Sequence, residues 1–130
     1  MELAMFLPFL LFLFIGSFDW GFYSWALLST QSAARAAALY TSTSGATAAD
    51  ATGACPYVLA ELADAPNVFG HVTTCSAAPV TVTATSLTGP DGSAATQVSV
   101  TYQTINLIPI PSLIPGQMNI TRTVEMRLQQ

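Results

Sequence analysis

The sequence predicts an α+β protein in which a long, hydrophobic N-terminal α-helix carries a small antiparallel β-sheet head. Residues 3–18 are apolar almost without a break, and the apolar character continues past Asp19 to Leu28. Between residues 80 and 128, apolar residues instead alternate with threonine and other polar residues, as in half-buried strands. A Gly-Pro-Asp-Gly-Ser segment at 89–93 is a strong turn signal between two such runs.

The N-terminal helix is too long to be buried by the rest of its own chain. Forty helical residues would extend about 60 Å, whereas a compact chain of this length has a radius of gyration of about 14 Å. We therefore expect residues 1–41 to form a transmembrane or filament-core helix and residues 42–130 to form a globular head. The apolar surface of the helix must be covered by lipid or by other protein.

Charge excludes one class of partner. Only 8% of residues are charged, the mean hydropathy is +0.51, and the net charge is -4 with three Arg and no Lys. Binding to phosphate backbones requires a basic face, so we expect no nucleic-acid partner.

Cys55 and Cys75 are the two cysteines of the chain. Beyond a membrane segment, this spacing favours one disulfide in an oxidising compartment. A loop of this length would contribute about 3 kcal/mol in the chain-entropy model. The alternative is a pair of buried free thiols.

The apolar segment is longer than the h-region of a signal peptide and lacks a positively charged n-region, so we expect it to be retained. Residues 3–28 are long enough to span a bilayer. Glu2 and Asp19, however, would both be costly in hydrocarbon. Aromatic residues lie on every face of this helix, which is typical of a helix that is covered on all sides.

In the head, we expect a short helix at about 56–64 that begins with Pro at its first position. The alternating segments predict strands at about 80–86, 96–105 and 119–128, the first two forming a hairpin. In the third strand, Arg122 falls on the same face as Ile120 and Val124, near a strand end or opposite a carboxylate of another subunit.

Two further segments carry weaker signals. The apolar, proline-rich run at 107–116 is excluded from a central strand, and forms either a contact surface or a loop folded over the core of the head. Asn119 begins an Asn-Ile-Thr glycosylation sequon, which matters only where the glycosylation machinery is present.

No set of residues for catalysis can be assembled. The chain has one His and no Lys, and it lacks metal-ligand spacings and a phosphate-binding loop. Glu61 and Asp64 are expected on a solvated helix face and His71 in a surface loop. We predict that the protein is not an enzyme and uses no metal or cofactor.

The N-terminal motifs resemble those of the TadE-like pseudopilins of the tight-adherence pilus system, a branch of the type IV pilin superfamily. Residues 2–8, Glu-Leu-Ala-Met-Phe-Leu-Pro, are similar to the V-E-F-A-L-V-L-P start of that family. Gly16-Ser-Phe-Asp-Trp-Gly21 is similar to its G-I-x-[ED]-x-G segment, and residues 33–38 to its A-A-R-x-A-A segment. A Leu-Ile-Pro-Gly run at 113–116, followed by a closing strand, also fits.

This resemblance implies a pilin-like fold and a precursor that waits in the inner membrane and is then polymerised by a pilus assembly machinery. The product would be an extracellular surface filament whose subunit binds other copies of itself. Glu2 takes the position of the helix glutamate that is thought to pair with the N-terminal amine of a neighbour in pilins. An unpaired carboxylate is costly in a low-dielectric core, so this residue would select a partner and a register.

Our first hypothesis is therefore a structural subunit of a type IV pilus-like filament. The alternatives are a minor pseudopilin that primes or caps a pilus, and a bitopic membrane protein whose head binds a partner. For the filament we expect a subunit interface that includes Glu2, Phe6, Pro8, Phe12, Asp19, Trp20, Phe22, Trp25 and Arg35.

Asp19 and Arg35 are about 24 Å apart along one helix, so they cannot pair within a subunit. Arg35 is the one basic residue of the helix. We predict that it meets an acidic residue of a neighbouring subunit, in the first instance Asp19, and so fixes the stagger between subunits, while aromatic packing supplies most of the energy.

Overall fold

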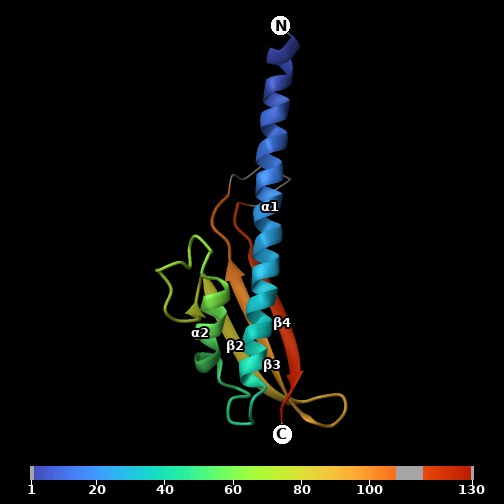
Figure 1. Cartoon of the computed structure of the whole chain (residues 1–130), viewed down its shortest axis with the longest axis vertical. Helices are drawn as coiled ribbons and strands as arrows, with labels where there is room; N and C mark the ends of the chain where they lie inside the picture. The colour runs from blue at the N-terminus through green and yellow to red at the C-terminus, as the bar shows by residue number, and fades with distance from the viewer. Residues whose placement is uncertain (1, 108–115, 130) are drawn as a thin grey trace.

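The structure is a computed structural model that describes residues 2–107 and 116–129, with the backbone alone for residues 2 and 3. It contains α1 (Glu2–Thr41), α2 (Ala51–Glu61), β1 (Ser76–Ala77), β2 (Val80–Thr88), β3 (Ala94–Gln103) and β4 (Asn119–Arg127). The strands form one antiparallel sheet in the order β1-β2-β3-β4. The C-terminal half of α1 packs on β3 and β4, and its N-terminal half extends beyond the head (Figure 1). The predicted α+β fold, with its pilin-like arrangement, is confirmed.

α1 runs without interruption from residue 2 to residue 41. Pro8 lies inside the helix and removes one backbone hydrogen bond from its exposed end. At the other end, successive hydroxyl groups donate to carbonyls of the last turn: Thr41 to Ala38 at 3.2 Å, Ser42 to Leu39 at 2.9 Å and Thr43 to Tyr40 at 2.8 Å. The Ala38 and Tyr40 carbonyls also accept from the Ser42 and Thr43 amides, and α1 ends here at the polar connection to α2.

α2 begins at Ala51, several residues before the start expected at 56, and ends at Glu61. The cause is an N-cap, because the Asp50 carboxylate accepts a hydrogen bond from the Gly53 amide at 2.8 Å. The other Asp50 oxygen accepts from the Tyr40 hydroxyl at 3.1 Å. A side chain at position 53 would collide with that hydroxyl, so this position requires glycine. Pro56 therefore lies inside α2 rather than at its first position.

The hairpin of β2 and β3 forms as the alternation predicts. It pairs Val80 with Tyr102 and continues in register to Thr88 and Ala94. The turn is closed by the Gly89 amide donating to the Ser93 carbonyl at 2.8 Å, and Gly92 adopts a positive φ of 77°. The Asp91 carboxylate accepts from the Ser93 amide, which lowers the pKa of Asp91.

The observed strands differ from the expected ones at their ends. β2 continues to Thr88, β3 starts at Ala94 and stops at Gln103, and β4 stops at Arg127. β1 lies between α2 and β2, where the sequence predicts no strand.

Tyr102 connects the sheet to the loop that follows α2. Its side chain is fully buried, and its hydroxyl donates to Asn67 Oδ1 at 2.7 Å, while Asn67 Nδ2 donates to the Gln103 carbonyl at 2.8 Å. Burial raises the pKa of the Tyr102 phenol above its ordinary value. The native state therefore binds the phenolic proton more tightly than the unfolded chain does.

We predict that Tyr102→Phe lowers the free energy of unfolding by about 1–2 kcal/mol, because Asn67 loses its donor while the ring stays in place. For the unchanged protein, stability should fall as the pH rises above about 10, the ordinary Tyr pKa, since the unfolded chain releases the phenolic proton first. The measurement is thermal unfolding of the detergent-solubilised full chain between neutral and alkaline pH.

Tyr57→Phe is the matched control, because the Tyr57 hydroxyl is exposed and bonds to no described residue. Equal losses in the two variants would contradict the role of the Tyr102 hydroxyl. A loss of stability at alkaline pH that is as large in Tyr102→Phe as in the unchanged protein would also contradict this role.

Candidate functional site

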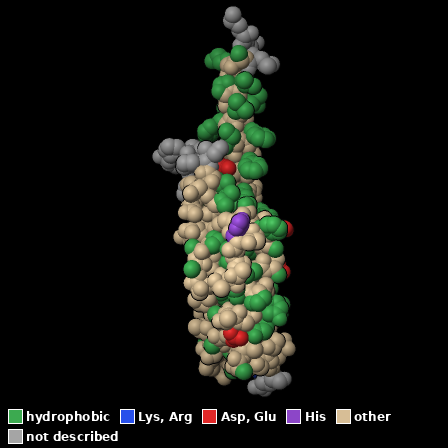
Figure 2. Space-filling model, turned by 90° about the vertical axis from the view of Figure 1, so that its left-hand side faces the viewer, with side chains coloured by type: hydrophobic (Ala, Val, Ile, Leu, Met, Phe, Trp, Pro, Cys, Tyr) green, Lys and Arg blue, Asp and Glu red, His purple; other side chains and the backbone are tan. Residues whose placement is uncertain are grey.

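The surroundings of α1 change at Asp19. Up to Phe18 no described helix or strand packs on α1, although Asn106 and Leu107 lie beside Phe14, Ile15 and Phe18. Large apolar side chains are exposed along this part of the helix (Figure 2). From Asp19 onward one face is buried against the head. Its residues recur at helical spacing: Asp19, Tyr23, Ala26, Thr30, Ala33, Ala34, Ala37, Ala38 and Thr41. We call this set the buried stripe.

The buried stripe is built mostly from alanine. Small side chains let a helix approach a sheet closely, and the facing core residues include Val98, Val100 and Tyr102. The Thr30 hydroxyl, also fully buried, donates to the Ala26 carbonyl of its own helix at 2.7 Å. The stripe therefore fixes the head to one side of α1.

The aromatic and proline residues expected at a subunit interface lie in three settings. We call the part of α1 before Asp19, residues 4–18, the free half. Phe6, Pro8 and Phe12 project from it, and Phe12 is 50% exposed. Trp20 is 68% exposed on a flank of α1, about 90° around the helix from the buried Asp19, Tyr23 and Ala26. Phe22 and Trp25 are half-buried, and their rings lie 5.7 Å apart. The free half and the Trp20 side thus remain available to a partner.

Asp19 is the buried charged residue of α1. Its side chain is 3% exposed, and its Oδ2 atom makes no hydrogen bond to any described residue. It lines a shallow pocket of about 230 Å³ together with apolar side chains of α1 and two residues that follow β3: Phe14, Ile15, Phe18, Asn106 and Leu107. Asp19, which the sequence predicted at a subunit interface, is thus covered by other residues of its own chain.

Arg35 lies on a different face of α1. The offset of sixteen residues from Asp19 corresponds to about 160° around the helix, and the Arg35 side chain is exposed. Arg35 forms no ion pair with the described part of the chain. The pairing of Arg35 with Asp19 of another subunit stays a prediction. The Glu2 side chain lies outside the described residues.

Arg122 lies mid-strand rather than at a strand end. It is half-buried on the inward face of β4, opposite Val100, and forms no ion pair with a described residue. Asn119 is exposed at the start of β4, where a sugar could be attached without disturbing the core, and its glycosylation stays a prediction. Most of the proline-rich run at 107–116 lies outside the described residues.

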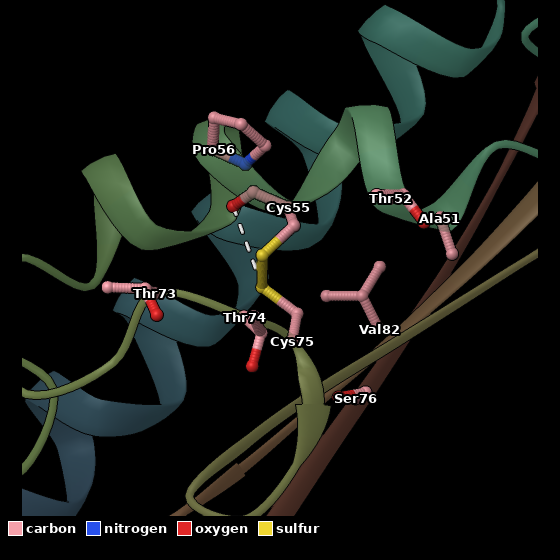
Figure 3. Close-up of a pocket in the computed structure, with 9 residues that line it drawn as sticks. All are labelled: Ala51, Thr52, Cys55, Pro56, Thr73, Thr74, Cys75, Ser76 and Val82. Carbon is pink, nitrogen blue, oxygen red and sulfur yellow. Dashed lines mark hydrogen bonds between the residues drawn. A yellow bond between two sulfur atoms is a disulfide. The ribbon is translucent and has the colours of Figure 1, made fainter.

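The expected disulfide is present. Cys55 of α2 and Cys75, just before β1, have their sulfur atoms 2.00 Å apart, and together they line an open hollow of about 310 Å³ with Thr73, Thr74 and Val82 (Figure 3). Cys75 Sγ also lies 3.7 Å from the Cys55 carbonyl oxygen, but an oxidised sulfur has no proton to donate. None of the described residues that line the hollow is titratable, so it offers no acid or base that could activate the hydroxyl groups of its Ser and Thr residues.

Within residues 2–107 and 116–129, no three His, Cys, Asp or Glu side chains are grouped so that they could hold a metal ion. The long apolar helix is therefore the candidate functional site. Over Ala4–Thr41 it is long and apolar enough to cross a membrane, as a membrane anchor or a signal-like segment would be.

In a comparison with known families, the model of the TadE-like protein family matches residues 1–39. The N-terminal segment of this chain is TadE-like. The match ends two residues before α1 does, so it covers the free half and most of the buried stripe. No curated protein and no solved structure matches the chain. The TadE-like helix points to a protein associated with tight-adherence pili, a class that is generally not enzymatic.

We predict that removing the disulfide lowers the free energy of unfolding by about 3 kcal/mol, because the unfolded chain regains the entropy of the loop between Cys55 and Cys75. The measurement is thermal unfolding of the full chain with and without reductant. A Cys55→Ala, Cys75→Ala variant serves as the control and should not respond to reductant. An unchanged unfolding midpoint in the reduced protein would contradict the prediction.

Proposed function

We propose that the chain is a structural subunit of an extracellular type IV pilus-like filament and polymerises through its TadE-like helix. The observation that carries the proposal is the free half of α1, whose apolar side chains are exposed on every face. In this proposal the helices bundle in the filament core and the β-sheet heads lie outside. The inner membrane holds the precursor until a pilus assembly machinery extracts it.

The energetics support this proposal. Fully burying one Leu, Phe or Met side chain contributes about 1.5–3 kcal/mol relative to water. Apart from Ile15, the large hydrophobic residues from Met5 to Phe18 are 50–84% exposed, so burying their remaining surface represents on the order of 10–20 kcal/mol. This is at least comparable with the cost of association, about 4–15 kcal/mol. A single molecule in water would expose all of this surface, so the free half requires lipid or neighbouring helices.

The head supports the same proposal. Its Thr-rich strands present few charges, and a disulfide ties α2 to the segment before β1. Such a head tolerates an oxidising environment outside the cell.

Electron microscopy of sheared surface material should show filaments whose main protein band is this chain. Filaments made chiefly of another protein would instead indicate a minor pseudopilin, and a detergent-soluble monomer without filaments a bitopic membrane protein.

We predict that Phe12→Ala reduces filament yield, because it removes an apolar side chain from the helix bundle of the filament core. Phe69→Ala is the matched control: Phe69 is 71% exposed but lies on the head, in the loop after α2. The measurement is the amount of sheared filament relative to total protein in each variant. Equal yields would show that the free half of α1 does not form the core.

We predict that Arg35→Gln changes filament assembly or its helical parameters, because Arg35 is the one basic side chain on the helix and is exposed. If its partner in the filament is Asp19, then Asp19→Asn should produce the same change and the double variant should be no worse than either alone. Unchanged filaments in both single variants would refute the pairing. A change in Asp19→Asn that is already visible in the detergent-solubilised monomer would place the role of Asp19 within the subunit.

A further inference from the structure

The outward side of α1 remains apolar beyond the point at which the head begins. Leu28 is 72% exposed on the side opposite the buried Asp19, Tyr23 and Ala26, and Trp20, on the flank between, is 68% exposed. Over residues 19–28 the helix therefore has one face covered by its own head and one apolar face with no cover among the described residues. A helix with one face packed on its own domain and an apolar opposite face is suited to a position at the surface of a lipid bilayer.

The distance between the two carboxylates of the helix supports this placement. The sixteen uncharged residues between Glu2 and Asp19 rise about 24 Å, whereas the hydrocarbon core of a bilayer is about 30 Å thick. A hydrocarbon core that begins at Glu2 therefore ends within about one helical turn of Asp19, which places Asp19 close to its second boundary. The exposed apolar residues from Met5 to Leu28 span about 35 Å along α1, which is long enough to cross the hydrocarbon core.

The part of the head beside Asp19 is suited to such a boundary. Asn106 and Leu107 line the Asp19 pocket, and the returning chain is joined to this segment by Leu107 N–H to Gly116 O at 2.7 Å and Thr104 N–H to Met118 O at 2.9 Å. We call the described residues 104–107 and 116–118 the rim. The sequence contains no charged residue between Asp91 and Arg122, so the rim is uncharged.

We propose that, in the membrane-held stage of the proposed function, the rim lies within the interfacial layer of the phospholipid bilayer and shields Asp19 from lipid. An exposed carboxylate in hydrocarbon costs several kcal/mol, and the rim replaces lipid at this position on α1. Trp20, on a flank of α1 at the same level, takes the interfacial position that tryptophan favours in membrane proteins. The head thus contacts the bilayer rather than being held away from it by a bare helix.

The test uses tryptophan reporters in the full chain, reconstituted into phosphatidylethanolamine–phosphatidylglycerol vesicles that carry nitroxide quenchers at defined depths. Trp20 and Trp25 are the two tryptophans of the chain, so Trp20→Phe, Trp25→Phe provides a silent background. Met118→Trp in this background reports on the rim, because Met118 is exposed. Leu13→Trp and Leu39→Trp, both at exposed positions on α1, report on the bilayer interior and on water.

We expect Met118→Trp to be quenched several-fold more by labels near the lipid headgroup than by labels at the chain ends. Leu13→Trp should show the opposite order, and Leu39→Trp should be quenched by neither. If Met118→Trp is unquenched while Leu13→Trp is quenched, the helix is inserted but the rim is not, and the inference is overturned. The inference is also overturned if Met118→Trp is quenched best by labels at the chain ends.

If Leu13→Trp is unquenched as well, the membrane-held stage itself is wrong, and the inference falls with it. Electron microscopy of filaments formed by the same variants separates this failure from a failure of the filament proposal. Far-UV circular dichroism of each variant verifies that the reporter has not unfolded the head.

Discussion

The structure depends on the close packing of the buried stripe of α1 against the sheet. Ala26, Ala34 and Ala38 are fully buried, and a larger side chain at any of them would hold the helix away from β3 and β4. At the C-terminal end of α1 the contact between the helix and the sheet is polar, and its hydroxyl groups are hydrogen-bonded. The Thr96 hydroxyl donates to the Ala48 carbonyl at 2.7 Å and lies 3.0 Å from the Thr41 hydroxyl. Because one face of α1 is used in this way, its remaining faces are free to carry apolar residues that the head does not cover.

Other parts of the head are connected to this packing by local bonds at the end of α1. Tyr40 bonds to the Asp50 carboxylate that caps α2, and the Gln129 amide donates to the Ser42 carbonyl at 2.8 Å, which brings the end of the chain to the same place. The disulfide then fixes α2 to the segment before β1. Both ends of the head are therefore anchored near the C-terminal end of α1, and the free half has no contacts with the strands.

The elements that could be predicted from the sequence are those with a local period or a local covalent constraint. The alternation of apolar residues with threonine identified β2, β3 and β4, and an uninterrupted apolar run identified α1. The start of α2 was missed because Asp50 stands in a Thr-, Ala- and Gly-rich segment typical of a linker. Gly53 lies in the first turn of α2 because of the close approach of Tyr40, a contact between distant residues that has no local signal in the sequence. The burial of Asp19 could not be predicted, because a helix that is apolar on every side gives no indication of which face meets the head.

Lipid and neighbouring helices are nearly equivalent surroundings for the free half of α1. Lipid tails are as apolar as leucine, so moving this helix from a bilayer into a filament core gains little from the hydrophobic effect. Close aromatic packing and the pairing of isolated charges are the terms that distinguish the two states, and both require a specific register between copies. Asp19 is covered by its own chain in the single molecule, so this carboxylate need not oppose the membrane-held state. In the proposed filament pathway, release from the membrane then depends on external work or on contacts that a single copy does not possess. Under this proposal, the subunit is stored as a monomer without polymerising prematurely.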